Sequence, residues 1–147
     1  MNIWIDIENK TEPPWSSKID RWYQLDEVSH AFCEALHRWN YLEDMPRPDV
    51  IFLALPGASN LADLEFAKAG ASSPAKFVYT LPNICAAVIL QLLGHRGKIY
   101  CINQGEQTLA FAKNEASAFA KNGAKAWLFS SPAILKDGHR EVIFENY

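Results

Sequence analysis

The sequence predicts an α/β protein, with a mostly parallel β-sheet and helices on both faces of that sheet. Two continuous apolar runs, at residues 49–55 and 126–131, have the composition of strands that are buried on both faces. Helical periodicity over residues 25–39 and an alanine-rich segment over residues 105–121 separate such strands along the chain. This alternation of strands and helices is typical of a parallel sheet covered by helices.

The individual elements follow from local patterns. At the N-terminus, Ile3, Ile5 and Ile7 alternate with Trp4, Asp6 and Glu8, and this period of two predicts a strand. Asn83 caps a helix that is apolar almost all round and that Gly94 ends. In chain order we expect a strand at 2–9, a helix at 25–39, a strand at 49–55, a helix at 61–69, an extended segment at 76–80, a helix at 84–93, a strand at 98–102, a helix at 105–121 and strands at 126–131 and 141–145.

The expected sheet has five strands within a single domain that spans residues 1–147. The last two strands are joined by a turn region at residues 132–140, so the final strand is expected to run antiparallel to its neighbour. The strand at 98–102 is apolar enough to be predicted as buried. The apolar helix at 84–93 is expected either in the core or beneath a partner chain.

Composition excludes several classes of function. The 147 residues include 17 acidic and 14 basic side chains, and this balance indicates neither nucleic-acid nor membrane binding. The first residues lack the pattern of a secretory signal, and the longest apolar run is too short to span a bilayer. We therefore expect a cytoplasmic protein.

The cysteines and histidines form no recognised ligand pattern. Cys33, Cys85 and Cys101 are widely spaced, odd in number and set among apolar neighbours, which favours buried structural thiols in a reducing compartment. His30 and His37 are seven residues apart on one predicted helix and are expected to be solvated. The sequence predicts neither a metal site nor a cofactor.

Two strand-to-helix turns are candidate sites, because ligands and nucleophiles in α/β sheets lie at the carboxyl ends of strands. The turn Asn103-Gln104-Gly105-Glu106-Gln107 offers no serine or cysteine, and the nearest hydroxyl, Thr108, lies inside the following helix. Its local pattern favours a helix start with an acid near the positive end of the dipole. Gly57-Ala58-Ser59 matches neither phosphate-binding fingerprint, so a plain turn is favoured there.

Residues 73–131 resemble the β-ketoacyl synthase family, which has the thiolase fold, and most closely its degenerate "chain length factor"-like branch. The likeness depends on the order of short motifs: Leu81-Pro82-Asn83 opening a helix, then Leu93-Gly94-His95-Arg96-Gly97, a strand, the turn at 103–107 and a buried helix. The resemblance implies an N-terminal thiolase-like half domain. In the family the Asn-opened helix packs at a dimer interface, which implies a binding role for Asn83, with Gln104, Gly105 and Glu106 at the turn.

The departures from the family pattern imply a protein without ketosynthase activity. Active members carry a cysteine at the turn, and counting from Tyr100 places Glu106, or with a shift of one residue Gln107, at that position. A carboxylate cannot form the acyl-thioester intermediate. The family's other catalytic groups, two histidines or a histidine and an asparagine, come from a second half of the fold that these 147 residues are not expected to contain.

The resemblance also implies a partner. In half of a thiolase fold, the helices at 84–93 and 105–121 are each expected to have one apolar side that the chain itself does not cover. Another chain is then needed to cover these surfaces. We expect a homodimer, or a heterodimer with a full ketosynthase, and binding of an acyl carrier protein, in polyketide, aryl-polyene or fatty-acid-type biosynthesis. Two alternatives stay open: a small enzyme using Glu106 with His95 nearby, and a module that binds an acyl or nucleotide ligand at the Gly105-Glu106 turn.

Overall fold

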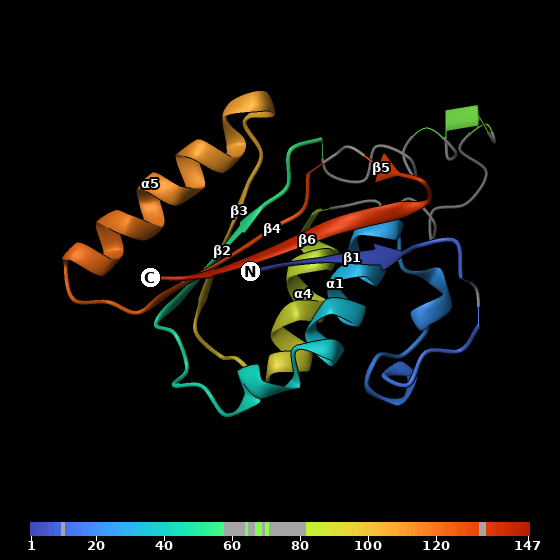
Figure 1. Ribbon diagram of the computed structural model, residues 1–147, viewed down its shortest axis with the longest axis horizontal. Coiled ribbons are helices and arrows are strands. Elements are labelled where there is room, and N and C mark those ends of the chain that lie inside the picture. Colours follow the sequence, from blue (N-terminus) through green and yellow to red (C-terminus); the bar gives the residue numbers. More distant parts are fainter. Residues whose placement is uncertain (10, 58–63, 65–66, 69, 71–81, 133–134) are drawn as a thin grey trace.

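The computed structural model describes residues 1–9, 11–57, 64, 67–68, 70, 82–132 and 135–147 (Figure 1). Its strands are β1 (Asn2–Asp6), β2 (Val50–Ala54), β3 (Lys98–Ile102), β4 (Ala126–Ser130), β5 (Leu135–Lys136) and β6 (His139–Asn146). The helices are α1 (Glu27–Arg38), α4 (Pro82–Leu93) and α5 (Thr108–Lys121), with 3-10 turns η1 (Ser16–Lys18), η2 (Trp22–Gln24), η3 (Asn40–Glu43) and η4 (Gly105–Gln107).

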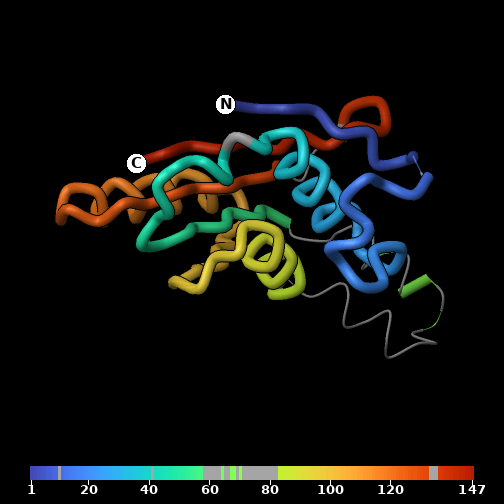
Figure 2. The backbone as a smooth tube through the Cα atoms, turned by 90° about the horizontal axis from the view of Figure 1, so that it is seen from below, coloured from blue at the N-terminus to red at the C-terminus, as the bar shows by residue number. Residues whose placement is uncertain are grey.

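All six strands belong to one mixed sheet with the order β1-β6-β4-β2-β3, and β5 pairs with β6. β2 runs parallel to both β3 and β4, with Val50 opposite Lys98 and Ala126. β6 runs antiparallel to β4, β1 and β5, and Figure 2 shows how this brings the two chain termini to one side of the molecule. The α/β class is confirmed. The prediction of a five-stranded, mostly parallel sheet is confirmed only in part, because the sheet is mixed.

The region predicted as a turn at 132–140 contains structure that the sequence analysis missed. Leu135–Lys136 and the start of β6 form a tight hairpin around Asp137 and Gly138, whose φ angles are +50° and +72°. Asp-Gly is a preferred pair for such a turn, because both central residues need positive φ. β6 therefore begins at His139 rather than at residue 141.

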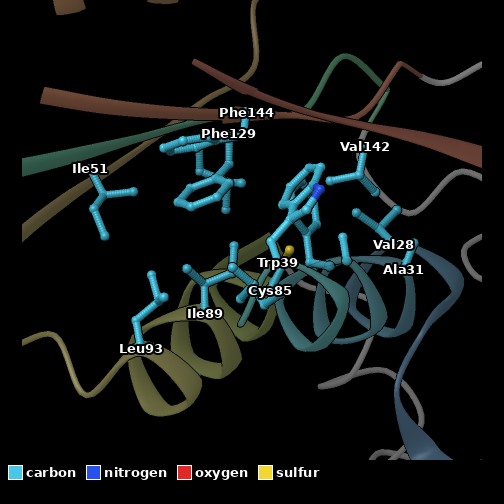
Figure 3. Close-up of a cluster of buried hydrophobic side chains, with 14 of the residues drawn as sticks. Val28, Ala31, Trp39, Ile51, Cys85, Ile89, Leu93, Phe129, Val142 and Phe144 are labelled. Atoms are coloured by element: carbon cyan, nitrogen blue, oxygen red, sulfur yellow. The ribbon is translucent and has the colours of Figure 1, made fainter. Parts of the chain in front are cut away.

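The larger core lies between the sheet and the pair of helices α1 and α4 (Figure 3). α1 is amphipathic as predicted, and its first turn is capped by Asp26, whose carboxylate accepts a hydrogen bond from the Ser29 backbone N–H at 2.8 Å. Phe129 and Phe144 point from the strands toward the helices, with ring centroids 5.1 Å apart. This face is closed by apolar side chains from every neighbouring element.

α4 is covered within the chain, which corrects the expectation that it would need a partner to cover it. Its Val88 side chain packs in a second cluster with Trp15, Ile19 and Cys33, all of which are buried. The N-terminal segment between β1 and α1 therefore supplies the wall that the sequence analysis assigned to another chain. Burying Trp15 contributes substantially to that side of the core.

The opposite face of the sheet carries α5 by itself among the described elements (Figure 1). Small side chains let α5 approach closely: Ala112 and Ala116 are fully buried against Phe52 and Leu128. Gly123, with a φ of +84°, follows the helix as predicted. Only one side of α5 contacts the sheet, and Phe111 on the helix is 39% exposed.

β3 was wrongly predicted to be buried. It forms one edge of the sheet, and of its five residues only Ile102 is buried. Tyr100 is 43% exposed and Cys101 is exposed. Edge and central strands can have the same apolar composition, so the sequence could not distinguish them.

Some predictions fall outside the described residues. These are the helix at 61–69, the extended segment at 76–80 and most of the turn at 57–59. Of the Leu81-Pro82-Asn83 motif, Pro82 and Asn83 begin α4. Among the described residues, no helix is long and apolar enough to cross a membrane.

Candidate functional site at the carboxyl end of β3

The turn between β3 and α5 is held by one buried hydroxyl. Thr108 Oγ1 accepts a hydrogen bond from the Gln104 backbone N–H at 2.6 Å and donates one to the Gly105 carbonyl oxygen at 2.7 Å. Gly105 has a φ of +58°, and a Cβ added there would meet nothing within 4 Å. The backbone angle, rather than lack of space, therefore favours glycine at this position.

A cleft of about 510 Å³ runs between β3 and α5, beside this turn. Tyr100 stacks on Phe52 with their ring centroids 5.6 Å apart, and Phe119 meets Phe52 edge-on at 5.4 Å. Phe111 and Glu115 line the cleft from α5, and Asn103 and Gln104 line it at the turn. The cleft thus combines aromatic walls with a few polar groups, a mixture that small-molecule sites also have.

The structure brings only part of the predicted binding set to this cleft. Gln104 lines it, whereas Gly105, Glu106 and Gln107 lie exposed in η4. Asn83 is exposed in the first turn of α4, which covers the opposite face of the sheet from α5. Asn83 and the helix that follows the turn therefore lie on opposite faces of the sheet.

His95 does not lie beside Glu106, which corrects the pairing in the enzyme alternative. His95 precedes β3, whereas Glu106 follows it. The five residues of β3 lie between them, and a strand rises by about 3.3 Å per residue. The pKa of His95 is lowered from its usual value, mainly by burial. A hydrogen bond with the Lys98 backbone raises it, and the charge of Arg47 lowers it. An acid–base pair of these two side chains is therefore excluded in this conformation.

The three thiols differ in environment, but all have raised pKa values. Burial, followed by the charges of Asp26 and Glu34, raises the pKa of Cys33. Burial likewise raises that of Cys85 well above its usual value. Cys101 is exposed on the edge strand, contrary to prediction, and yet neighbouring groups exclude enough water to raise its pKa too. A thiolate nucleophile is disfavoured at each position.

The histidines are less uniform than predicted. His37 is exposed, as expected, but His30 is half-buried and meets Trp15 edge-on with ring centroids 5.1 Å apart. In the part of the chain that the structure describes, no group of three or more histidine, cysteine or acidic side chains could hold a metal ion.

Arg140 is a buried charge that the sequence analysis overlooked. It is 1% exposed, donates hydrogen bonds to Ser131 Oγ at 3.3 Å and the Pro132 carbonyl at 3.0 Å, and lies 3.5 Å from Glu27. Burial lowers its pKa, against the opposing effect of Glu27. The period-two pattern of β6 contained the signal, because Arg140 shares its face with Val142 and Phe144. Its contacts tie β6 to the start of α1.

The fold has a counterpart among solved structures. A chain in the structure of a ketosynthase (ApeO) in complex with its chain length factor (ApeC) from Xenorhabdus doucetiae matches with a TM-score of 0.65 and 13% sequence identity. The match covers 95% of this chain and 65% of that chain, so this chain spans less than two thirds of its length. No family model and no curated protein matches the sequence. The protein therefore has a thiolase-like fold.

Proposed function

We propose that the chain is a non-catalytic, ketosynthase-like subunit that partners a condensing enzyme in polyketide, aryl-polyene or fatty-acid-type biosynthesis. The observation that carries the proposal is the turn after β3. In a fold of the ketosynthase type this turn presents exposed Glu106 and Gln107, with no thiol among residues 103–107. Acyl transfer to the enzyme needs a nucleophile, a base and an oxyanion site within mutual reach.

The assignment to the chain-length-factor-like branch, as an N-terminal ketosynthase-like domain over residues 1–147, belongs to the same proposal. It is supported by the sequence resemblance over residues 73–131 and by a structural neighbour that comes from a complex of a ketosynthase with its chain length factor. A role as a subunit also fits the uneven surface of the sheet. The α1 and α4 face is closed, whereas α5 and β3 expose Phe111 and Tyr100.

Co-expression with a full ketosynthase and an acyl carrier protein from the same organism tests the proposal. The chain is expected to co-purify with the ketosynthase, and light scattering is expected to give the mass of a defined complex. Condensation by the ketosynthase should depend on the presence of the chain. A chain that neither self-associates nor binds the synthase or the carrier protein would overturn the proposal.

A second experiment addresses the missing nucleophile. Glu106→Cys should restore no condensation activity in the isolated chain, and neither should Gln107→Cys, which is included because counting from Tyr100 allows a shift of one residue. A thiol at the turn would still lack the family's other catalytic groups. Mass spectrometry of the condensation product, with acyl and malonyl carrier proteins as substrates, measures this directly. Turnover by either variant would contradict a non-catalytic role.

The cleft is the observation that favours the alternative of an acyl-binding module. Its aromatic walls and its polar end at Gln104 could hold an acyl chain and its head group. A ligand that binds only the folded state raises the unfolding temperature as its concentration rises. A thermal screen against acyl-CoA species, with nucleotides as the other arm, separates this alternative from a protein-only docking role.

A further inference from the structure

The cleft between β3 and α5 has one charged group among its described lining residues, the carboxylate of Glu115. The other described side chains of the lining are aromatic, aliphatic, amide or thiol groups, and no lysine or arginine is among them. Glu115 is half-buried and forms no ion pair within the part of the chain that the structure describes. Lys113, the basic residue nearest to it in the sequence, pairs with Glu145 at 2.6 Å instead. The cleft therefore contains a negative charge that no described cation compensates.

Aromatic rings line the cleft on both sides of this carboxylate. Phe111 and Phe119 lie one helical turn before and after Glu115 on α5, and residues four apart occupy the same side of a helix. Across the cleft, Tyr100 has one face stacked on Phe52, so its other face is turned away from Phe52. The ring centroids of Tyr100 and Phe119 are 6.3 Å apart. A ligand in the cleft would therefore meet aromatic rings from the strand and from the helix.

We propose that this cleft binds a small organic cation with an alkylated ammonium group. The faces of aromatic rings carry partial negative charge and attract such a cation, while their apolar surface covers its methyl groups. The carboxylate of Glu115 supplies the opposite charge. The volume of about 510 Å³ is typical of a small-molecule site. This ligand goes beyond the proposed role as a subunit and does not depend on it.

The same lining disfavours other classes of ligand. A phosphate group, as in acyl-CoA species or nucleotides, would lie near Glu115 with no described cationic side chain in the cleft to compensate its charge. A divalent metal ion is held by several oxygen ligands, and Glu115 is the sole carboxylate among the described lining residues. Charge and aromatic surface together therefore favour an organic cation.

NMR titration of the full chain with choline tests the proposal. The matched control ligand is the neutral carbon isostere of choline, in which a tert-butyl group replaces the trimethylammonium group. Choline is expected to bind at least about tenfold more tightly than this alcohol, because the charge alone distinguishes the two ligands. The largest changes in amide chemical shift are expected in β3 and α5. Equal affinities for the two ligands, or no binding of choline, would overturn the proposal.

Variants of the chain test whether choline occupies this cleft. Glu115→Gln keeps the size of the side chain but removes its charge, and it should weaken choline binding roughly tenfold. Phe111→Leu keeps an apolar side chain but removes a ring, and it should weaken binding about threefold. Asp44→Asn neutralises an exposed carboxylate outside the cleft and should leave the affinity unchanged. Unchanged binding in both cleft variants would place choline elsewhere and contradict the proposal.

Two further measurements keep the outcome clear. Circular dichroism checks that each variant is folded, and if one unfolds, the other still reports on the cleft. Competition with an acyl-CoA species forms the other arm: displacement of choline by acyl-CoA would make the cleft an acyl site and the proposal wrong. Binding to a ketosynthase is measured separately, so a failure of choline to bind does not bear on the proposed role as a subunit.

Discussion

The two faces of the sheet are built differently. On one face, α1 and α4 cover the strands, and the N-terminal segment with Trp15 and Ile19 covers α4 in turn. On the other face, α5 packs through small residues such as Ala112 and Ala116 and leaves its outer side open. The first face therefore buries the larger apolar cluster, whereas on the second face Phe111 of α5 remains partly exposed.

The polar groups of the two sides also differ. Arg140, Asp26 and Ser29 are buried on the α1 side, where they hold strand and helix ends together. Exposed Glu106 and the cleft lie on the α5 side. We therefore expect substitutions on the α1 side to change folding, and those on the α5 side to change binding.

The largest expected effect is the difference in the free energy of unfolding lost when one phenylalanine on each face is replaced by alanine. Phe129→Ala empties a fully buried site and should lower the free energy of unfolding by about 4 kcal/mol. Phe111→Ala removes a ring that is 39% exposed and should cost no more than about 1 kcal/mol. Urea denaturation of both variants measures the difference. Similar losses would show that α5 is covered in the isolated chain.

The next effect concerns the buried charge. Arg140→Met removes the guanidinium that faces Glu27 and should cost about 3 kcal/mol, because breaking a buried ion pair leaves the remaining charge poorly compensated. Arg38→Met is the matched control. Arg38 pairs with Glu34 at 2.8 Å but is exposed, so its loss should cost about 0.5 kcal/mol. Equal costs in chemical denaturation would mean that the Arg140 contacts contribute little.

The smallest expected effect is a pH dependence of the stability that Glu34, on α1, contributes. Burial alone would raise the pKa of Glu34, but hydrogen bonds from Trp15, at 2.8 Å, and from Arg38 lower it below its usual value. A carboxylate whose pKa is lowered by folding stabilises the protein at pH values above its pKa in the unfolded chain. This stabilisation is lost as the pH falls through its pKa in the folded protein. Trp15→Phe should therefore cost about 1 kcal/mol more at neutral pH than in acid.

Unfolding measured from neutral pH to below pH 4.5, the usual pKa of this carboxyl, tests the dependence. Trp127→Phe, at another buried tryptophan, provides the control for lost packing and should cost the same at each pH. A loss in Trp15→Phe that does not change with pH would show that the indole contributes packing but little stabilisation of the carboxylate.

Local patterns identified most elements because each pattern reflects a physical constraint within a short stretch of chain. Ile3, Ile5 and Ile7 alternate because one face of β1 meets the core. Gly94 and Gly123 end helices at positive φ, where other residues are strained. The turn at residues 103–107 was located correctly for the same reason, since a strand must end before a helix can begin.

Other features depended on contacts between distant segments. Apolar composition shows that a strand is suited to a sheet but does not indicate whether both of its edges are paired, so β3 was taken for a buried strand. The cover over α4 comes from residues more than sixty positions earlier in the chain. His95 and Glu106 are close in sequence, yet a strand lies between them.

The sequence by itself determined the α/β class, the position of the turn after β3 and the absence of a thiol there, because these depend on residue identity and local periodicity. Only the tertiary structure decided that β3 lies at an edge of the described sheet, that α5 keeps an exposed side and that Arg140 is buried. Those features arise when segments far apart in the chain compete to cover the same apolar surface, and local pattern does not encode the outcome.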